Sequence, residues 1–194
     1  HYDGAGKIPI SSWKKYGKKL KQKFNIDSKQ NLYEVGCGSG AFLYLFKDLK
    51  KIGGCDFSGN LIRYCRKFLP NHSKNILEKK SEEISISPKY DFVVSHGLLH
   101  YLNNISAKKT IIKMIKKSSN KIILLDIPEK KFKKKYLLLR KKALGETIYN
   151  NKYKNLNHNY YTKSFFSKIA KKEGCSYFFF KSDIEKHKQG KYRF

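Results

Sequence analysis

The chain alternates short runs of apolar and β-branched residues with longer segments in which apolar residues recur at helical spacing. Residues 90–95 (Tyr-Asp-Phe-Val-Val-Ser) contain the continuous apolar stretch typical of a strand buried on both faces of a sheet. Strand signals in alternation with helix signals predict a parallel sheet with helices on both faces. At 194 residues the chain fits one domain. We therefore expect a single α/β domain over residues 1–194, with a doubly wound, Rossmann-like sheet.

The hydrophobic pattern places the expected elements in a regular order. Strands are expected at residues 31–35, 52–56, 75–79, 90–95 and 121–126, and a last strand begins within 190–194. Helices are expected at residues 40–50, 58–68, 106–117 and 162–173, with Ser58 as an N-cap and Gly174 ending the last helix before residues 175–181. Residues 1–25 and 129–161 stand outside this alternation.

The chain is strongly basic, with a formal net charge of +28 from 43 basic and 15 acidic residues. Lysines are spread over almost every segment, whereas arginine occurs only at positions 63, 66, 140 and 193. Specific recognition of phosphates and bases usually relies on the planar, two-pronged guanidinium group of arginine. We therefore interpret the charge as a solvated surface, with attraction to an anionic substrate or surface as the alternative.

The four cysteines at positions 37, 55, 65 and 175 show no CxxC spacing and no pairing with histidine. This pattern predicts neither a metal site nor a disulfide framework. No apolar run approaches the roughly 18 residues of a membrane span, and no signal-peptide pattern opens the chain. The simplest expectation is a reducing, cytoplasmic setting.

A glycine-rich turn follows the first expected strand. Residues 31–40 read Asn-Leu-Tyr-Glu-Val-Gly-Cys-Gly-Ser-Gly, and Gly36 and Gly38 let the backbone pass close to a ligand. The expected helix start after Gly40 offers free backbone N–H groups. About twenty residues beyond Gly36, Asp56 ends the second expected strand, where it can accept both hydroxyl groups of a ribose. The combination predicts a nucleoside cofactor.

The glycine turn alone does not choose between two cofactors. Residues 36–41 (Gly-Cys-Gly-Ser-Gly-Ala) also fit the relaxed dinucleotide pattern, so an NAD(P)-dependent oxidoreductase is an alternative. Glu34 favours S-adenosylmethionine (SAM), since a carboxylate at the lip of the first strand would repel a pyrophosphate but suits the ammonium of a methionine moiety. A further alternative is a basic RNA-binding or membrane-surface protein that keeps the fold without catalysis.

Three segments together resemble class I SAM-dependent methyltransferases, most closely the small-molecule branch called type 11. They are residues 32–40, residues 54–58 (Gly-Cys-Asp-Phe-Ser) and residues 90–102, which end in Ser-His-Gly-Leu-Leu-His-Tyr-Leu. The likeness covers residues 30–126 best. The resemblance implies a mostly parallel seven-stranded sheet with an antiparallel last strand. It also implies SAM as the cofactor and S-adenosylhomocysteine (SAH) as its product.

The resemblance also implies what individual residues do. Glu34 would sit near the methionyl amine, Asp56 would hold the ribose and Phe57 would lie against the adenine. Relatives often carry an aspartate after the third strand that contacts the adenine amine, and here Glu82 is our choice for that role. The full set expected at the cofactor is Glu34, Gly36, Cys37, Gly38, Gly40, Asp56, Phe57, Ser58, Ser81, Glu82, Ser95 and His96.

The segment after the fourth strand bears on the methyl acceptor. Families that methylate exocyclic amines of DNA bases carry an Asn/Asp-Pro-Pro-aromatic run there, whereas residues 95–101 contain no proline. The paired-glutamate loop of arginine methyltransferases is missing from the sequence as well. We therefore expect a small molecule rather than a nucleic acid as the acceptor, methylated through oxygen. An anionic acceptor, bearing a phosphate or a sugar, fits the charge.

Three histidines are candidate bases for that transfer. His96 and His100 follow the fourth strand, at the edge where open α/β sheets bind ligands, and His158 belongs to a stretch that lies over the acceptor pocket in relatives. A hydrogen-bonded, structural role is the alternative for each of them. The residues expected to line the acceptor pocket are Tyr2, Trp13, Tyr16, Tyr101, Tyr160 and Tyr161, with packing in the core as the alternative.

Relatives place further segments over the site, so we expect residues 1–25 to form a helical lid and residues 129–161 a cap insertion over the acceptor pocket. The cap contains a strongly basic helix with one narrow apolar stripe, made of Phe132, Tyr136, Leu139 and Ala143. Three roles are open for this helix. It could pack on its own domain, rest on an anionic membrane surface, or help to hold a phosphorylated acceptor. The single narrow stripe favours packing on its own domain.

Overall fold

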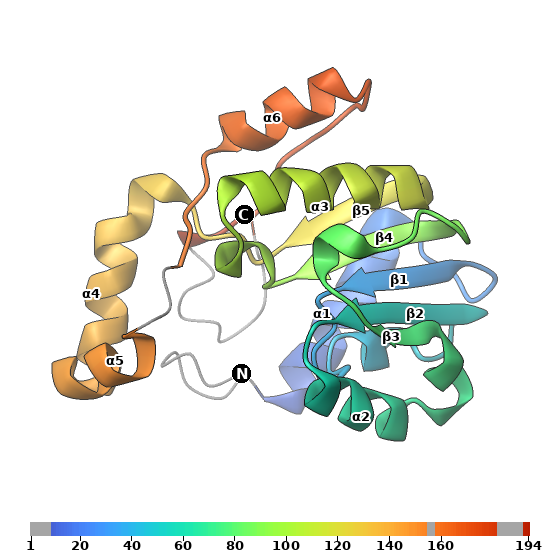
Figure 1. Cartoon of the computed structure of the whole chain (residues 1–194), viewed down its shortest axis with the longest axis horizontal. Helices are drawn as coiled ribbons and strands as arrows, with labels where there is room; N and C mark the ends of the chain where they lie inside the picture. The colour runs from blue at the N-terminus through green and yellow to red at the C-terminus, as the bar shows by residue number, and fades with distance from the viewer. Residues whose placement is uncertain (1–8, 155–157, 182–191) are drawn as a thin grey trace.

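The computed structural model describes residues 9–154, 158–181 and 192–194, and a five-stranded parallel sheet lies at its centre (Figure 1). The strands are β1 (Asn31–Val35), β2 (Lys51–Asp56), β3 (Ile76–Glu78), β4 (Tyr90–His96) and β5 (Ser118–Leu125). Their order across the sheet is β3-β2-β1-β4-β5, with every neighbouring pair parallel. The order reverses between β1 and β4. Open α/β sheets bind ligands at the carboxyl ends of the strands at such a reversal.

Helices cover both faces of the sheet, as the alternation of elements predicts. The helices are α1 (Ile10–Phe24), α2 (Gly59–Phe68), α3 (Asn104–Lys117), α4 (Lys133–Leu144), α5 (Glu146–Tyr153) and α6 (Lys163–Lys172). Helices α1 and α2 share one buried cluster with the sheet, while α3 packs on the opposite face and α6 packs against α3. Short 3₁₀ turns occur at Leu43–Phe46, Pro70–Asn75, Ser81–Glu83, Leu99–Tyr101 and Lys130–Phe132.

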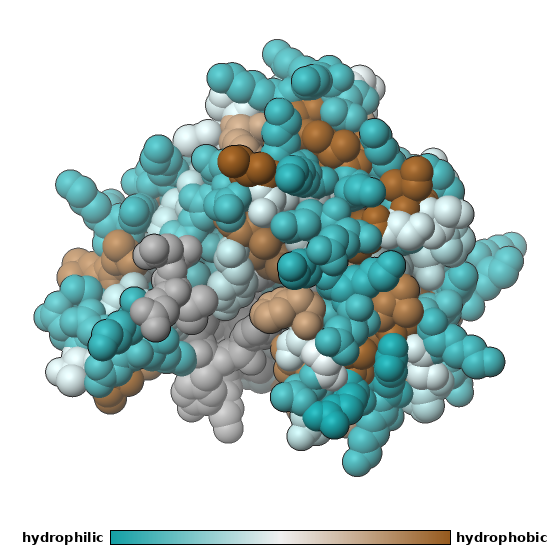
Figure 2. All heavy atoms as spheres, in the orientation of Figure 1, coloured by the Kyte–Doolittle hydropathy of each residue, from teal (hydrophilic) through white to brown (hydrophobic). Residues whose placement is uncertain are grey.

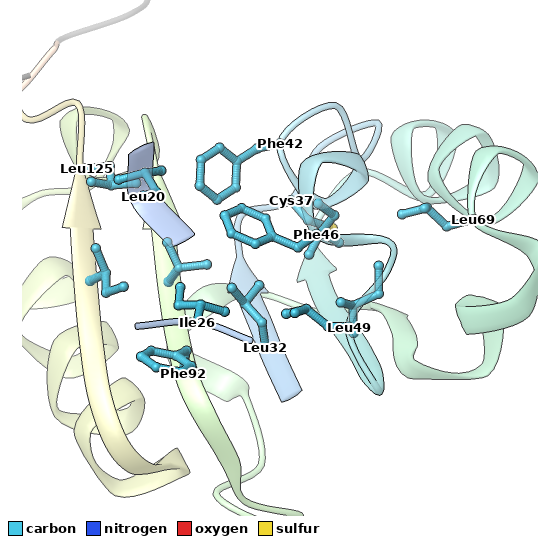
Figure 3. Close-up of a cluster of buried hydrophobic side chains, with 14 of the residues drawn as sticks. Leu20, Ile26, Leu32, Cys37, Phe42, Phe46, Leu49, Leu69, Phe92 and Leu125 are labelled. Carbon is cyan, nitrogen blue, oxygen red and sulfur yellow. The ribbon is translucent and has the colours of Figure 1, made fainter. Parts of the chain in front are cut away.

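The largest part of the core lies between the sheet and the layer of α1 and α2 (Figure 3). Alternation along β1 explains why: Leu32 points to this side, whereas Tyr33 and Val35 pack on the side of α3. Figure 3 shows Leu32, Phe46 and Phe92 side by side in this layer. Glu34 follows the alternation of Leu32, so its carboxylate enters the same layer at the carboxyl end of the strand.

Side-chain caps close the starts of two helices, and the sequence predicts the one at Ser58. The hydroxyl of Ser58 accepts from the backbone N–H of Leu61 at 3.4 Å, at the start of α2. The hydroxyl of Thr162 accepts from the N–H of Phe165 at 3.3 Å, at the start of α6. Each cap satisfies a donor that would otherwise be orphaned at a helix start.

The expected seven-stranded sheet with an antiparallel last strand is wrong for the part of the chain that the structure describes. Residues 175–181 form no strand there: Phe180 packs on Phe24 of α1 at 5.7 Å between ring centroids, and Phe179 packs on Phe194 at 5.5 Å. Residues 192–194 do run antiparallel to residues 127–129, but through a single isolated bridge. Positions 190 and 191 lie outside the described residues.

The helix expected at residues 40–50 is also wrong, because the structure has a turn and a 3₁₀ helix there. Of the four buried side chains in this segment, Leu43, Phe46 and Leu49 are spaced three apart, and Phe42 is buried next to Leu43. That spacing matches the three residues per turn of a 3₁₀ helix, in which positions i and i+3 are eclipsed. Burial of these three side chains therefore favours the tighter helix.

Helices α4 and α5 form a pair that stands beyond the carboxyl ends of the strands (Figure 1). Tyr136 in the expected stripe is buried, but Ala143 is exposed. The second buried side chain of α4 is Arg140, one turn after Tyr136. The buried face of α4 therefore contains fewer of the expected apolar side chains, and the cation Arg140 is buried on it beside Tyr136. Among the described helices, none is both long and apolar enough to cross a membrane.

Candidate active site

A buried acid lies at the carboxyl end of β1, where the strand order reverses. Glu34 is only 2% exposed, and its Oε2 finds no hydrogen-bond partner within the part of the chain that the structure describes. Burial raises the pKa of this carboxyl well above its usual range, and Cys65 and Asp56 raise it further, while the backbone N–H of Leu43 opposes them. A buried, unsatisfied carboxylate is costly unless a cation or donor meets it. The site therefore suits a ligand that brings a positive group to Glu34.

Asp56 ends the neighbouring strand and holds the glycine turn. Its Oδ2 accepts from the N–H of Gly38 at 2.9 Å, and its Oδ1 accepts from the N–H of Ser58 at 3.0 Å. A carboxylate has about four acceptor positions, so both oxygens can accept further hydrogen bonds from ribose hydroxyls. Phe57, the next residue, is 74% exposed and offers an open ring face beside this carboxylate.

The three glycines of the turn have different roles. All three adopt positive φ angles, of 78° at Gly36, 52° at Gly38 and 85° at Gly40. A Cβ on Gly36 would lie 2.9 Å from Leu98, and one on Gly40 would lie 2.5 Å from the Sγ of Cys65. A Cβ on Gly38 would meet only open space, with one atom at 4.0 Å. Gly38 therefore leaves space on its open side, while the other two glycines are required by packing.

Three further residues expected at the cofactor, Cys37, Ser81 and Ser95, are buried. Cys37 is buried, and its hydrogen bond with Cys65, together with burial, raises the pKa of its thiol. Ser95 is buried near the end of β4, and none of the described residues forms a hydrogen bond with its hydroxyl. Ser81 accepts from the hydroxyl of Thr110 on α3 at 3.0 Å.

Two acids follow β3 at the rim of this region. Glu82, the residue expected at the adenine amine, accepts a hydrogen bond from the hydroxyl of Ser106 on α3 at 3.3 Å. Sequence reasoning missed a second acid, Glu78, which ends β3 directly beside Asp56 in the sheet register. Its position at a strand end, in line with Asp56, is the signal that could have found it.

His96 is enclosed by aromatic rings. It stacks on Phe42 at 4.9 Å between ring centroids and meets the edge of Trp13 at 5.4 Å. Helix α1 therefore lies against the end of β4, where a lid would be. Tyr16, also expected to line the acceptor pocket, is only 2% exposed and packs in the core of the described residues. Tyr2 lies outside the described residues.

His100 and His158 lie together beyond β4. Their ring centroids are 5.0 Å apart, and Tyr101 lies 5.1 Å from His158. Burial lowers the pKa of His100 well below its usual range, and the charge of Arg193 adds to this effect. His100 is therefore neutral near pH 7, and a proton placed on it would be held only weakly.

Arg140 determines the tautomer of His158. Its Nη1 lies 2.8 Å from the Nδ1 of His158. A guanidinium group has donors only, so it donates and Nδ1 accepts. The imidazole must then be neutral, with its proton on Nε2. In this arrangement Nδ1 is not available as a general base.

Sequence reasoning missed the two buried arginines of this region, Arg140 and Arg193, which are 2% and 3% exposed. Arg193 forms an ion pair with Asp126 at 2.5 Å and donates to the backbone oxygen of Asp126 at 3.0 Å. It also donates to the hydroxyl of Tyr136. The rarity of arginine in a lysine-rich chain is the signal that could have found them.

A cavity of about 470 Å³ lies among α4, α5 and the segment around His158. Tyr160, one of the residues expected at the acceptor, is among the residues that line it. Tyr161 does not: it is 2% exposed, and its hydroxyl donates to the backbone oxygens of Leu99 at 2.8 Å and Leu102 at 2.9 Å. Tyr161 is thus a core residue that anchors the segment, because its hydroxyl satisfies two backbone carbonyls at once.

Known proteins resemble this chain in both sequence and structure. A family model described as a methyltransferase domain matches residues 33–127. A protein of Invertebrate iridescent virus 6 that is named as a methyltransferase is 29% identical over 111 residues, which is 56% of this chain and 41% of that protein. The malonyl-[acyl-carrier protein] O-methyltransferase of Acetivibrio thermocellus is 27% identical over 120 residues, covering 59% of this chain and 40% of that protein.

The fold matches solved methyltransferase structures at low sequence identity. The magnesium protoporphyrin IX methyltransferase from Synechocystis, solved with SAH, has a TM-score of 0.62 at 14% identity, covering 87% of this chain and 78% of that one. The chain spans about two fifths of the length of the two curated relatives above. A family match over residues 33–127 spans the glycine turn, both strand-end acids and the segment after β4. Residues 33–127 therefore match a methyltransferase domain, and the chain has the fold of a solved methyltransferase.

Proposed function

We propose that this protein transfers the methyl group of SAM to an oxygen of a small anionic acceptor. The observation that carries the proposal is Glu34, a buried carboxylate with an unsatisfied oxygen beside an open glycine turn. SAM carries an ammonium group and a sulfonium, whereas a dinucleotide would bring a pyrophosphate. The negative charge of the Glu34 carboxylate favours the positively charged groups of SAM and opposes the pyrophosphate of a dinucleotide.

The strand ends supply binding and orientation. Glu34 pairs with the ammonium of the methionine moiety, Gly38 lets the cofactor approach the backbone, and Asp56 accepts from the ribose hydroxyls. Phe57 offers its exposed ring to the adenine. When bound, the cofactor supplies an electrophilic methyl group on sulfur. The chain then has to hold the acceptor oxygen in line with it and to exclude water.

The two histidines beyond β4 act in positioning rather than as strong bases. His100 is buried and neutral, and the Nδ1 of His158 is occupied by Arg140. Alignment can account for a large part of the acceleration in a methyl transfer. Two reactants that are already held in line react without a further loss of translational and rotational entropy. We propose that alignment accounts for most of the acceleration here.

A transfer assay tests this function. Methyl-labelled SAM is incubated with the protein and with small acids that carry a second oxygen function, each beside a neutral analogue. We expect labelled methyl ethers or esters from the acids, and loss of product with Glu34→Gln. Label found only on amines, or SAH release that is equal with acids and neutral analogues, would contradict the proposal.

A further inference from the structure

The cavity between α4 and α5 has the size of a ligand site. Its volume of about 470 Å³ lies within the range of roughly 300–1,000 Å³ that is usual for small-molecule pockets. It is lined by Lys133, Leu137, Tyr149, Asn150, Tyr153, Lys154, His158 and Tyr160. Through the ring of His158 the cavity reaches His100, at the carboxyl edge of the sheet. It is therefore placed for an acceptor rather than for the cofactor.

The described lining carries positive charge and hydrogen-bond donors. Lys133 and Lys154 contribute ammonium groups, and the described lining includes no aspartate or glutamate. The Nζ of Lys133 lies 5.5 Å from the ring centroid of Tyr160, so one ammonium sits close to the cavity wall. A concave site lined by charges of one sign concentrates ligands of the opposite sign.

Behind this lining Arg140 adds a buried, rigidly held cation. Its guanidinium lies 4.8 Å from the ring centroid of Tyr136 and 4.9 Å from that of Tyr153. Stacking between two rings fixes the plane of the guanidinium. Because its Nη1 donates to Nδ1 of His158, the lining imidazole carries its remaining hydrogen on Nε2 and is a donor.

Tyr160 supplies a further donor. Its side chain lines the cavity and is only 8% exposed, and its hydroxyl finds no hydrogen-bond partner among the described residues. Burial raises the pKa of this phenol above its usual value, so the hydroxyl keeps its proton. A buried hydroxyl without a partner, on a residue that lines a cavity, is a candidate donor to a ligand.

The rest of the described wall consists of two tilted aromatic rings, a leucine and the amide of Asn150. The rings of Tyr149 and Tyr153 lie 4.9 Å apart with 44° between their planes, and Leu137 completes this side. Aromatic side chains favour offset or tilted contact with another ring. The cavity therefore combines a surface for a planar body with donors and cations for an oxyanion.

We propose that this cavity binds a carboxylate or phosphate on a planar acceptor, and holds it as a handle while a different oxygen of the same molecule is methylated. An oxyanion surrounded by cations and donors is a poor nucleophile, since its lone pairs are engaged. The bound anion is thus the part that is recognised, not the part that reacts. This inference rests on the proposed function, because only methyl transfer makes the cavity an acceptor site.

Binding of simple probes tests the inference. The full chain, saturated with SAH, is titrated calorimetrically with benzoate, phenyl phosphate and benzyl alcohol, which share a ring and differ in charge. We expect at least one of the two anions to bind about tenfold or more tightly than the alcohol, a difference of about 1.4 kcal/mol. Whichever anion binds better identifies the handle as a carboxylate or a phosphate.

Matched variants separate the cavity from the general positive charge. The double variant Lys133→Met, Lys154→Met should lose most of the preference for the anion. Lys134→Met with Lys135→Met removes the same charge from exposed positions outside the cavity lining, and should change the preference by less than about twofold. Tyr160→Phe keeps the shape of the side chain and should weaken anion binding about three- to tenfold. Circular dichroism checks that each variant is folded.

Equal affinity for the anions and the alcohol would overturn the inference, as would an equal loss in the two double variants. SAH affinity, measured in the same samples, separates this inference from the proposed function. If SAH binds but the anions show no preference, only the cavity inference fails. If the anions bind selectively but SAH does not bind, the proposed function fails and the cavity remains an anion site.

Discussion

At the scale of a residue, Glu34 is a buried acid that costs the folded protein stability. Its carboxyl is buried with an unsatisfied oxygen, and burial raises its pKa. An acid whose pKa is raised in the folded state binds more protons there than in the unfolded chain. The stability of the cofactor-free protein therefore falls as pH rises from the unfolded pKa of a glutamate, about 4.3, through the higher folded value.

We predict that Glu34→Gln stabilises the cofactor-free protein and weakens the cofactor site. Glutamine has the same shape but no charge to desolvate, so the free energy of unfolding near pH 7 should rise by about 1 kcal/mol or more. The gain should shrink as pH falls toward 4. Urea unfolding of both proteins across this pH range measures it, and a gain that does not depend on pH would contradict the assigned cause.

The tautomer of His158 gives a second prediction at this scale. Since Arg140 donates to Nδ1, nitrogen NMR should show an unprotonated Nδ1 and a protonated Nε2 near neutral pH. If His158 and His100 only position other groups, His158→Gln and His100→Asn should each lower kcat by less than about tenfold. A loss of about a thousandfold in either variant would identify that histidine as the general base.

Residue identity alone predicted the strand-end acids but not the buried arginines. Glu34 and Asp56 follow recognisable strands, so their place at the edge of the sheet could be inferred from order in the chain. Arg140 lies among lysines in a basic helix, and such residues are usually solvated. Its burial depends on Tyr136 and Tyr153 stacking around it, which is a tertiary arrangement that no local pattern encodes.

At the scale of elements, the glycine turn makes a prediction that compares three neighbouring positions. Gly36→Ala and Gly40→Ala should each destabilise the fold by about 2 kcal/mol or more, because the positive φ and the contacts with Leu98 and Cys65 add up. Gly38→Ala meets open space and should lose only about 1 kcal/mol.

Cofactor affinity should follow the opposite order in these variants. A methyl group on Gly38 projects into the space where the ligand passes, so Gly38→Ala should bind SAH at least about tenfold more weakly while remaining folded. Thermal unfolding and calorimetry measure the two effects separately. Equal loss of stability at all three positions would contradict the division between packing glycines and a ligand-facing glycine.

The elements themselves were predictable to different degrees. The strands from residue 31 to 125 and the caps at Ser58 and Thr162 follow from local periodicity and capping chemistry, and the structure contains them. The segment at residues 40–50 has helical periodicity, yet packing of Leu43, Phe46 and Leu49 favours a 3₁₀ turn. The aromatic run at residues 175–181 has strand propensity, yet its rings pack on Phe24 and Phe194 instead of extending the sheet.

At the scale of the whole molecule, the net charge of +28 acts at long range. Figure 2 shows a mostly hydrophilic face with apolar side chains scattered across it. Such a charge attracts anionic acceptors before they reach the cavity. An increase in ionic strength from about 0.01 M to about 0.15 M shortens the Debye length from about 30 Å to about 8 Å.

We therefore predict that salt raises the KM for an anionic acceptor and leaves kcat nearly constant. The KM for a neutral analogue should change little over the same range, because it experiences no long-range attraction. Initial rates at several salt concentrations measure both constants. A fall in kcat with constant KM would instead indicate that charge acts on the chemical step.

Calorimetric titration of the protein with SAH and with NADH tests the central claim most directly. We predict that SAH binds and NADH does not, and that Asp56→Asn weakens SAH binding at least about tenfold. Exposed Asp48→Asn, a matched substitution outside the glycine turn, should leave SAH affinity unchanged. Tight binding of NADH with no binding of SAH would contradict the account and assign the glycine turn to a dinucleotide.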